Sequence, residues 1–201
     1  MPHNCNDYIV SGEKFIRNFE KMYEDIDDPW NQNADGIVKE FNILALLLQE
    51  ENQKRAQQKE LSVLDIGCAN GYHMERFLGD LSCSKYVGTD ISKTIIRKAN
   101  KQNKSMVANY DVSFIVDDIS KKNNNFVNAF DIIFSSKTLY YCAPEIDDVI
   151  ENCCNYLVEN GIFAFIYNQT NDSFSNQWLT YDLLTHKLLM RGFNMIDLVI
   201  Y

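Results

Sequence analysis

Carboxylates recur in this 201-residue chain where short apolar runs, typical of buried strands, come to an end. They are Asp65 in the run 61–66, Asp90 at the end of 85–90, and the pair Asp117 and Asp118 at the end of 112–118. A single aspartate there is explained as a turn former or helix cap. Three in consecutive strand–helix units favour a binding site, with one carboxylate suited to accept both hydroxyls of a ribose.

Small residues follow the first of these carboxylates. Gly67, Ala69 and Gly71 leave no bulky side chain where the chain turns toward the next helix. A ligand can therefore approach the backbone closely at that point. In open α/β sheets this edge, at the carboxyl ends of the strands, is where ligands bind.

The elements that must position these residues alternate between strand and helix. Apolar runs predict strands at 61–66, 85–90, 112–118, 129–134 and 161–167, and helical spacing predicts helices at 72–80, 92–103, 146–157 and 178–190. Ser92 is suited to cap the second of these helices. This alternation predicts an α/β fold with a doubly wound, mostly parallel sheet and right-handed connections.

The two ends of the chain depart from the alternation. Helical spacing predicts a helix at 11–24 with Ser11 as its N-cap, a loop at the Asp28-Pro29-Trp30 stretch, and a second helix from Asp35. We therefore expect a helical lid or extension at 1–60 and a core at 61–201 that form one domain overall. A polar loop at 171–176 and a final strand at 193–201 are expected, so that the sheet is one strand short or the chain is truncated.

The charge and the cysteine spacing of the chain exclude several classes of binding partner. A net charge of −9 and a pI near 4.8 argue against nucleic acid, and the cations Arg97, Lys98, Lys101 and Lys104 are interpreted as the solvated side of a helix. The six cysteines lack the spacing of a zinc site, so no metal is expected. With no signal peptide and no apolar run of membrane length, we expect a cytoplasmic chain with reduced thiols and no membrane partner.

Four ordered motifs resemble those of class I S-adenosylmethionine-dependent methyltransferases. They are Val63-Leu-Asp-Ile-Gly-Cys-Ala-Asn-Gly71, Val87-Gly-Thr-Asp-Ile91, Val116-Asp-Asp-Ile119 and Phe130-Asp-Ile-Ile-Phe-Ser-Ser-Lys-Thr-Leu-Tyr-Tyr141. The resemblance covers about 61–167, and it implies a Rossmann-like methyltransferase fold that binds S-adenosylmethionine and releases S-adenosylhomocysteine. One departure is Ala69, where the family often has glycine; its methyl group is tolerated if φ stays below zero.

The resemblance also implies roles for individual residues. Those around the methionine part of the cofactor are Asp65, Gly67, Cys68, Ala69, Gly71 and Ser135, with Asp65 near the ammonium group. Asp90 accepts hydrogen bonds from the ribose, and Ile91 presses on the adenine. Asp118, of the pair Asp117 and Asp118, bonds the adenine amino group, with Ile119 beside the ring.

A narrower resemblance concerns the acceptor. The Asp28-Pro-Trp30 stretch, the turn 66–69 and Leu139-Tyr-Tyr141 resemble NodS-type N-methyltransferases, which modify an amino sugar. Candidate acceptor-side residues are His73, Tyr140 and Tyr141, with Trp30 as a lid. Each has a plain alternative: His73 on a helix surface, one of the tyrosines in the core, and Trp30 filling a hydrophobic gap. Lys137 is interpreted as solvated.

These observations predict a methyltransferase for a small-molecule acceptor, an amine such as an amino sugar being favoured over a hydroxyl. Methyl transfer from a sulfonium is a direct displacement, so alignment and exclusion of water matter most. A non-catalytic methyltransferase-fold partner subunit is the first alternative. An NAD(P)-dependent oxidoreductase is the second, although the turn lacks the GxGxxG ending. Oligomeric state is left open.

Overall fold

The structure is a computed structural model, which describes residues 5–11, 14–31, 35–54, 60–168 and 178–199. A five-stranded sheet with order β5-β4-β3-β6-β7 forms its centre, and every pairing in that sheet is parallel. The strands are β3 (Leu61–Ile66), β4 (Cys83–Asp90), β5 (Asp111–Val116), β6 (Phe130–Ser136) and β7 (Leu157–Ile166). The predicted doubly wound α/β fold is therefore confirmed.

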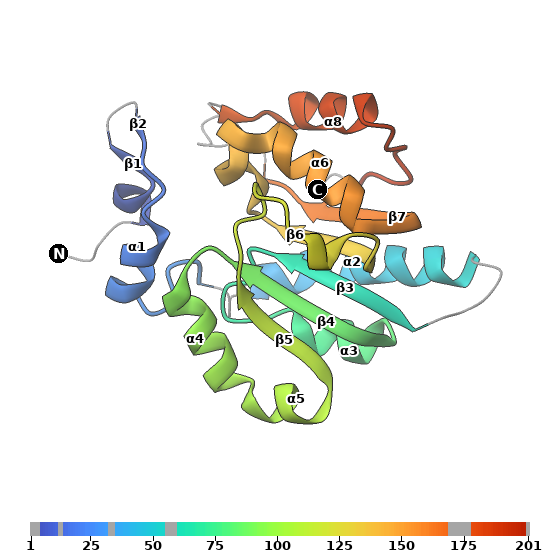
Figure 1. Cartoon of the computed structure of the whole chain (residues 1–201), viewed down its shortest axis with the longest axis horizontal. Helices are drawn as coiled ribbons and strands as arrows, with labels where there is room; N and C mark the ends of the chain where they lie inside the picture. Colours follow the sequence, from blue (N-terminus) through green and yellow to red (C-terminus); the bar gives the residue numbers. More distant parts are fainter. Residues whose placement is uncertain (1–4, 12–13, 32–34, 55–59, 169–177, 200–201) are drawn as a thin grey trace.

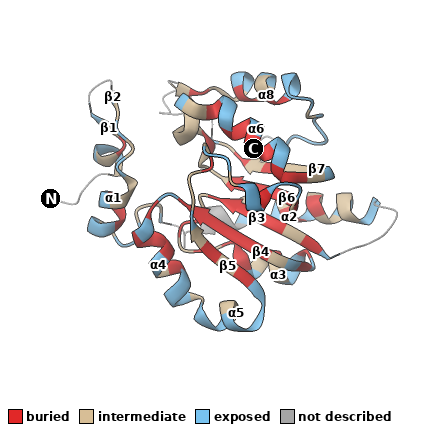
Figure 2. Ribbon diagram, in the orientation of Figure 1, coloured by how far each residue is buried: buried red, intermediate tan, exposed pale blue. Residues whose placement is uncertain are grey.

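Helices cover both faces of the sheet (Figure 1). One face packs against α2 (Asp35–Lys54), α3 (Met74–Asp80) and α4 (Lys93–Gln102), and the other against α6 (Ile146–Tyr156) and α8 (Tyr181–Met190). Shorter helical elements are α5 (Lys104–Asn109), η2 (Asn124–Phe126) and η3 (Leu139–Glu145). The buried residues of Figure 2 concentrate in the strands and on the helix faces turned toward them, as burial on both sides of a parallel sheet requires.

The four core helices that the periodicity predicts are present, with changes at their ends. α4 begins after Ser92, whose hydroxyl accepts a hydrogen bond from the amide of Ile95 at 3.3 Å, so the predicted N-cap is confirmed. α3 begins at Met74, two residues later than predicted. Of the adjacent cysteines in α6, Cys153 is buried and Cys154 is exposed. Among the described residues, no helix combines the length and apolarity needed to span a membrane.

The N-terminal segment differs from its prediction. Instead of one helix over 11–24, the structure has η1 (Cys5–Tyr8), a hairpin of β1 (Val10–Ser11) and β2 (Lys14–Phe15), and then α1 (Phe19–Asp25). Asn18, not Ser11, caps α1. Phe15 stacks on Trp178 with ring centroids 5.1 Å apart. A contact so distant in sequence favours the hairpin over the helix that local spacing alone suggested.

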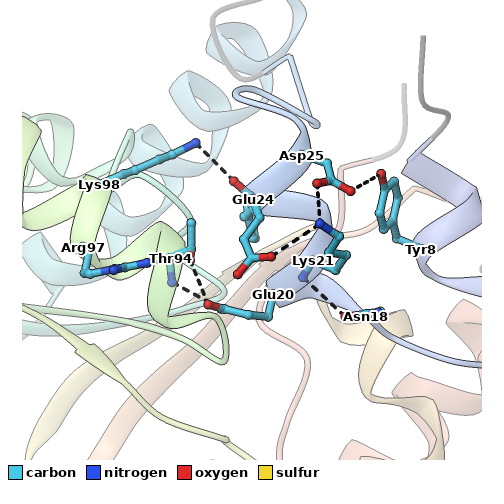
Figure 3. A network of polar contacts seen from close by, with 10 residues as sticks. Tyr8, Asn18, Glu20, Lys21, Glu24, Asp25, Thr94, Arg97 and Lys98 are labelled. Carbon is cyan, nitrogen blue, oxygen red and sulfur yellow. Dashed lines mark hydrogen bonds and ion pairs between the residues drawn. The ribbon is translucent and has the colours of Figure 1, made fainter. Parts of the chain in front are cut away.

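Glu20 holds α1 against the start of α4 (Figure 3). Its carboxylate accepts hydrogen bonds from the hydroxyls of Ser92 at 2.6 Å and Thr94 at 2.8 Å, and from the amide of Thr94 at 3.2 Å. Burial alone would raise the pKa of Glu20, but these hydrogen bonds lower it. The ionised form is thus favoured by the folded contact.

We expect Glu20→Ala to loosen α1 from α4, because the three groups that donate to its carboxylate lose their shared partner. Hydrogen exchange of α1 amides should speed up several-fold while that of β4 stays unchanged. Glu24→Ala is the control, since Glu24 is exposed and, among the described residues, forms its one ion pair with Lys21 at 3.7 Å. Because folding lowers the pKa of Glu20, its ionised carboxylate stabilises the folded state. This stabilisation is fully present above the unfolded pKa and is lost as pH falls through the folded pKa. Equal exchange in both variants would contradict this role.

The C-terminal end also differs from its prediction. Residues 193–199 form no strand, and the side chains of this stretch are largely exposed. Gly192, at φ 89°, ends α8 in the left-handed conformation typical of helix C-termini. The predicted loop at 171–176 lies outside the described residues, as does the far end of the predicted final strand.

Candidate functional site

The carboxyl ends of β3, β4 and β6 meet at one edge of the sheet. Asp65 lies opposite Gly88 in β4 and Phe134 in β6, and Ile66 lies opposite Ser135. Asp90 lies opposite Val116 at the end of β5. The fold thus brings the predicted acidic residues and Ser135 to a common rim.

Asp65 is the most deeply buried acid of this rim, with 1% of its surface exposed. One carboxylate oxygen accepts a hydrogen bond from the Tyr86 hydroxyl at 2.5 Å, and the other, Oδ1, is buried and has no hydrogen-bond partner among the residues that the structure describes. Burial raises the pKa of Asp65 to about 7, and the nearby charge of Asp90 adds to the rise while Tyr86 opposes it. A buried oxygen left unpaired in this way is costly, and a cationic or hydrogen-bonding ligand would relieve the cost.

Asp90 joins the end of β4 to the small-residue turn. Its Oδ1 accepts a hydrogen bond from the amide of Ser92 at 2.9 Å, and the backbone amides of Ala69 and Ile91 also bond to it. Burial raises the pKa of Asp90 to about 6 despite these bonds. Ile91, which follows it, is an exposed apolar side chain at the rim.

The turn between β3 and α3 has three residues at positive φ: Gly67 at 71°, Ala69 at 47° and Gly71 at 81°. Ala69 was expected to be tolerated if its φ stayed below zero, and the structure contradicts that expectation. This alanine adopts the left-handed conformation, at a cost of roughly 1–2 kcal/mol. Amides of Gly67 and Cys68 donate to the Thr89 carbonyl at 2.8 and 2.9 Å. A Cβ at Gly67 would lie 2.4 Å from the Thr138 hydroxyl oxygen, so only glycine fits there.

The two acids after β5, Asp117 and Asp118, have different hydrogen-bond partners. The carboxylate of Asp118 accepts hydrogen bonds from the amide and hydroxyl of Ser120 and pairs with Lys121 at 3.3 Å; burial opposes the resulting lowering of its pKa. Asp117 accepts a hydrogen bond from Asn123 at 3.1 Å, its other oxygen has no partner, and burial raises its pKa. Ile119 is buried in the core beneath α6 and α8.

The three acceptor-side candidates are not equivalent. His73 is buried, stacks on Phe41 with centroids 5.0 Å apart, and has no hydrogen-bond partner for Nδ1. Burial lowers the pKa of His73 to about 3, with the positive charges of Arg76 and Lys137 adding to the effect. It is a neutral core side chain, so the helix-surface alternative is wrong.

Tyr140 and Tyr141 lie on η3, directly after β6, and touch edge to face with centroids 4.4 Å apart. Tyr141 faces the N-terminal segment, where it contacts Phe19 at 5.3 Å and Trp30 at 5.6 Å. Tyr140 faces Tyr167 near the end of β7. Burial raises the pKa of both tyrosines, so both are neutral hydrogen-bonding groups near neutral pH.

Several residues at this rim were not anticipated. Tyr23 is buried, accepts a hydrogen bond from Trp30 at 2.7 Å, and has its pKa raised by burial and by the charge of Asp90. Lys137, expected to be solvated, forms an ion pair with Glu40 at 2.7 Å. A tyrosine within a buried strand needs a partner for its hydroxyl, so the Tyr86 contact had a sequence signal; the contacts of Tyr23 and Lys137 span distant elements and had none.

The architecture and the acidic rim are those of a Rossmann-like methyltransferase, and comparison with known proteins gives the same class. The family model described as "Methyltransferase domain" matches residues 57–191. This chain belongs to that methyltransferase family. It is accordingly an enzyme of the class I S-adenosylmethionine-dependent group, with S-adenosylmethionine as its cofactor. The predicted cofactor and enzyme class are confirmed, and both alternatives, a partner subunit and an oxidoreductase, are set aside.

Solved structures resemble the chain in fold. The N-methyltransferase NodS from Bradyrhizobium japonicum WM9, solved with S-adenosylhomocysteine, has a TM-score of 0.65 and 21% identity, covering 86% of this chain and 85% of NodS. The PH0226 protein from Pyrococcus horikoshii OT3 has a TM-score of 0.55 and 27% identity, covering 73% of this chain and 66% of that one. At such identity the likeness to NodS concerns the fold alone.

Curated relatives overturn the expected acceptor. A protein of Aliivibrio fischeri (strain MJ11) named tRNA U34 carboxymethyltransferase is 35% identical over 103 residues, which are 51% of this chain and 31% of the relative. A protein of the same name from Cellvibrio japonicus is 28% identical over 99 residues, covering 48% of this chain and 29% of the relative. The chain thus spans about a third of the length of these relatives. Their names point to RNA, so both the small-molecule acceptor and the exclusion of nucleic acid are corrected.

Proposed function

We propose that this enzyme transfers a group from its S-adenosylmethionine-type cofactor to a uridine of transfer RNA. The observation that carries the proposal is the likeness to enzymes named for that substrate, at 35% identity over half of this chain. Net charge misled the prediction because it averages over the whole surface, whereas nucleic-acid binding depends on where cations gather. The transferred group is methyl or, as in the relatives' name, carboxymethyl.

The rim residues fit the cofactor's chemistry. Asp65 would hold the ammonium group through its unpartnered Oδ1, and Ser135, whose buried hydroxyl oxygen also lacks a partner, would hold the adjoining methionine polar groups. Around them, Gly67, Cys68, Ala69 and Gly71 would offer backbone groups at a turn that admits close approach. When bound, the cofactor supplies an electrophilic carbon on a sulfonium.

The ribose and adenine would lie further along the rim. Asp90 would accept hydrogen bonds from the ribose hydroxyls, and the exposed side chain of Ile91 would cover one adenine face. Asp118 would be the partner for the adenine amino group, as its place in the third motif implies. Its carboxylate bonds to Ser120 and Lys121, whereas Asp117 bonds to Asn123. Ile119 would support that loop from within the core.

An aromatic cluster suits a nucleobase acceptor. Phe19, Trp30, Tyr140 and Tyr141 form a connected set of rings next to the rim. Enzymes that modify a base take it out of its stack and hold it between aromatic or apolar side chains. The cluster combines the N-terminal segment with η3, so the segment before α2 would act as a lid. The expected lid of residues 1–60 on a core of 61–201 is thus shortened, because α2 packs on the sheet as part of the core.

Proton transfer makes modest demands on these residues. His73 would be a weak base, because burial lowers its pKa to about 3, and it packs in the core rather than among the rings. The neutral hydroxyls of Tyr140 and Tyr141 would orient the base by hydrogen bonds. Alignment of the acceptor and exclusion of water would therefore supply most of the rate enhancement. A cytoplasmic location, where transfer RNA and reduced thiols are both found, accords with this function.

The test is a transfer assay with unfractionated transfer RNA and cofactor labelled in the transferable methyl group. We expect label in the RNA, and mass spectrometry of its nucleosides should find a modified uridine. A parallel reaction with cofactor carrying a carboxymethyl sulfonium distinguishes the two groups. Tyr141→Ala should slow transfer at least tenfold while cofactor affinity changes little, with Leu189→Ala, at an exposed apolar side chain of α8, as control. No label in RNA with either cofactor would contradict the proposal.

A further inference from the structure

We propose that the outer side of α4 and the start of α5 bind the sugar-phosphate backbone of the RNA substrate. This inference rests on the proposed function, because it assigns a surface to that substrate. Residues 91–110 carry five of the chain's 19 Lys and Arg residues and none of its 28 Asp and Glu residues. In a chain of net charge −9, such a stretch is a distinct local exception.

Four of these cations form what we call the basic face: Lys93, Arg97, Lys101 and Lys104. All four are exposed. The first three are four residues apart, which places them on one side of α4 about 6 Å from one to the next along the axis. Ile95, Ile96 and Ala99 are buried on the side toward the sheet. The three cations of α4 therefore form a regular row, comparable in spacing to the phosphates of a nucleic-acid strand, and Lys104 follows at the start of α5.

The cations of the basic face are available to an anion. Within the described part of the chain, none of the four forms an ion pair, and Arg97 donates one hydrogen bond, to the Thr94 hydroxyl at 2.9 Å. The fifth cation, Lys98, differs: it donates to Asp27 at 2.9 Å and to the Tyr23 carbonyl at 3.3 Å. Two acids of the neighbouring N-terminal segment are thus engaged: Asp27 by Lys98, and Glu20 by the start of α4. Figure 3 shows the contact of Glu20 with Thr94. The outer row of cations therefore keeps its positive charge.

The position of the basic face links it to the reaction. α4 begins three residues after Asp90, at the rim, and leads away from the rim to α5 (Figure 1). A strand of RNA lying along α4 would therefore reach the aromatic cluster at one end. Phosphate contacts of this kind fix register and orientation without reading sequence, and they make affinity strongly dependent on salt.

The experiment measures binding of a fluorescently labelled transfer RNA transcript by anisotropy, at several salt concentrations. The test variant carries Arg97→Gln, Lys101→Gln and Lys104→Gln. The control carries Lys54→Gln, Lys187→Gln and Arg191→Gln, which changes the net charge equally on other surfaces. S-adenosylhomocysteine affinity, unchanged in both, reports that the fold is intact.

For the test variant we expect affinity for transfer RNA to fall at least tenfold, and the slope of log affinity against log salt to decrease by about 2, as three lost phosphate contacts imply. The control should change affinity less than about threefold. Equal losses in the two variants, or competition by polyglutamate as strong as by RNA, would overturn the basic face as an RNA surface. Absence of any binding or modification of transfer RNA by the wild-type chain would instead overturn the proposed function, and this inference with it.

Discussion

Asn in place of Asp65 is expected to make the cofactor-free protein more stable at about pH 8 and to weaken cofactor binding. Burial raises the folded pKa of Asp65 to about 7, against about 3.9 in an unfolded chain. The folded state therefore binds this proton more tightly, and stability is highest below the unfolded pKa and is lost as pH rises through the folded one. Ionised Asp65 costs on the order of 4 kcal/mol at pH 8, and Asn removes that cost while still accepting from Tyr86.

Urea unfolding of both proteins at pH 8 and near pH 4 tests the stability effect. The gain from Asp65→Asn should be several kcal/mol at pH 8 and should fall below about 1 kcal/mol near pH 4, where the carboxyl is protonated in the folded state and about half protonated in the unfolded one. Equal stability of the two proteins across this range would contradict a raised pKa at Asp65.

The same substitution should lower affinity for S-adenosylhomocysteine by roughly ten- to a hundredfold, because a charge-assisted hydrogen bond is worth about 1.5–3 kcal/mol. Wild-type affinity should also fall as pH drops below about 7, since the carboxyl must then lose its proton on binding. Tyr86→Phe is the matched variant: it removes the hydrogen bond that lowers this pKa, so the midpoint should move to higher pH. A pH-independent wild-type affinity would remove Asp65 from the ammonium site.

Truncation of Asp90 is expected to lower cofactor affinity about as much as Asp65→Asn does, but to lower stability, whereas Asp65→Asn raises it. Asp90→Ala should cost cofactor affinity about 1.5–3 kcal/mol, and it leaves the buried amides of Ser92 and Ala69 without their acceptor. Near pH 4, where little of the cost of burying an ionised Asp90 remains, stability should therefore fall by about 1–3 kcal/mol. Asp90→Asn keeps an acceptor for those amides, so it should lose affinity with little loss of stability.

Calorimetric titration with S-adenosylhomocysteine and urea unfolding of the two Asp90 variants separate these effects. Affinity that stays at the wild-type level in both variants would exclude Asp90 from the cofactor site. Affinity lost only in the alanine variant would mean that Asp90 acts by holding the turn rather than by contacting the ribose.

Much of the core could be predicted because local and tertiary preferences agree there. The run 61–66 is apolar on both sides and lies between two strands, and Ser92 caps α4 whether or not the rest of the chain is known. The rim followed from topology, since parallel strands must place Asp65 and Asp90 at the same edge. The positions of Asp65 and Asp90 could therefore be predicted without knowing any contact between distant parts of the chain.

Three predictions of local structure were wrong because contacts outside the local sequence pattern determine the conformation there. Phe15 fits a helix by spacing, yet it pairs with Trp178 from a hairpin. The φ of Ala69 is set by its neighbours in the turn and by the bond of its amide to Asp90. The final strand was predicted from apolar content, but a strand also needs a neighbour to pair with, and residues 193–199 have none among the described strands.

The acceptor was mispredicted because short motifs near residues 28–30 and 139–141 are shared by enzymes with different substrates. The motifs of the cofactor rim, by contrast, are common to the whole class of methyltransferases, so the cofactor could be predicted from them. The exclusion of nucleic acid rested on net charge, which sums over the whole chain and so does not register that five cations and no acid lie within 91–110.

The most direct test of the rim as the cofactor site is a crystal structure of the chain with S-adenosylhomocysteine. We expect its ammonium group on Asp65 Oδ1, its ribose hydroxyls on Asp90, and its adenine between Ile91 and the loop of Asp118. Density for the ligand elsewhere, or a bound ligand with Asp65 Oδ1 still unpartnered, would contradict the assignment of these strand ends.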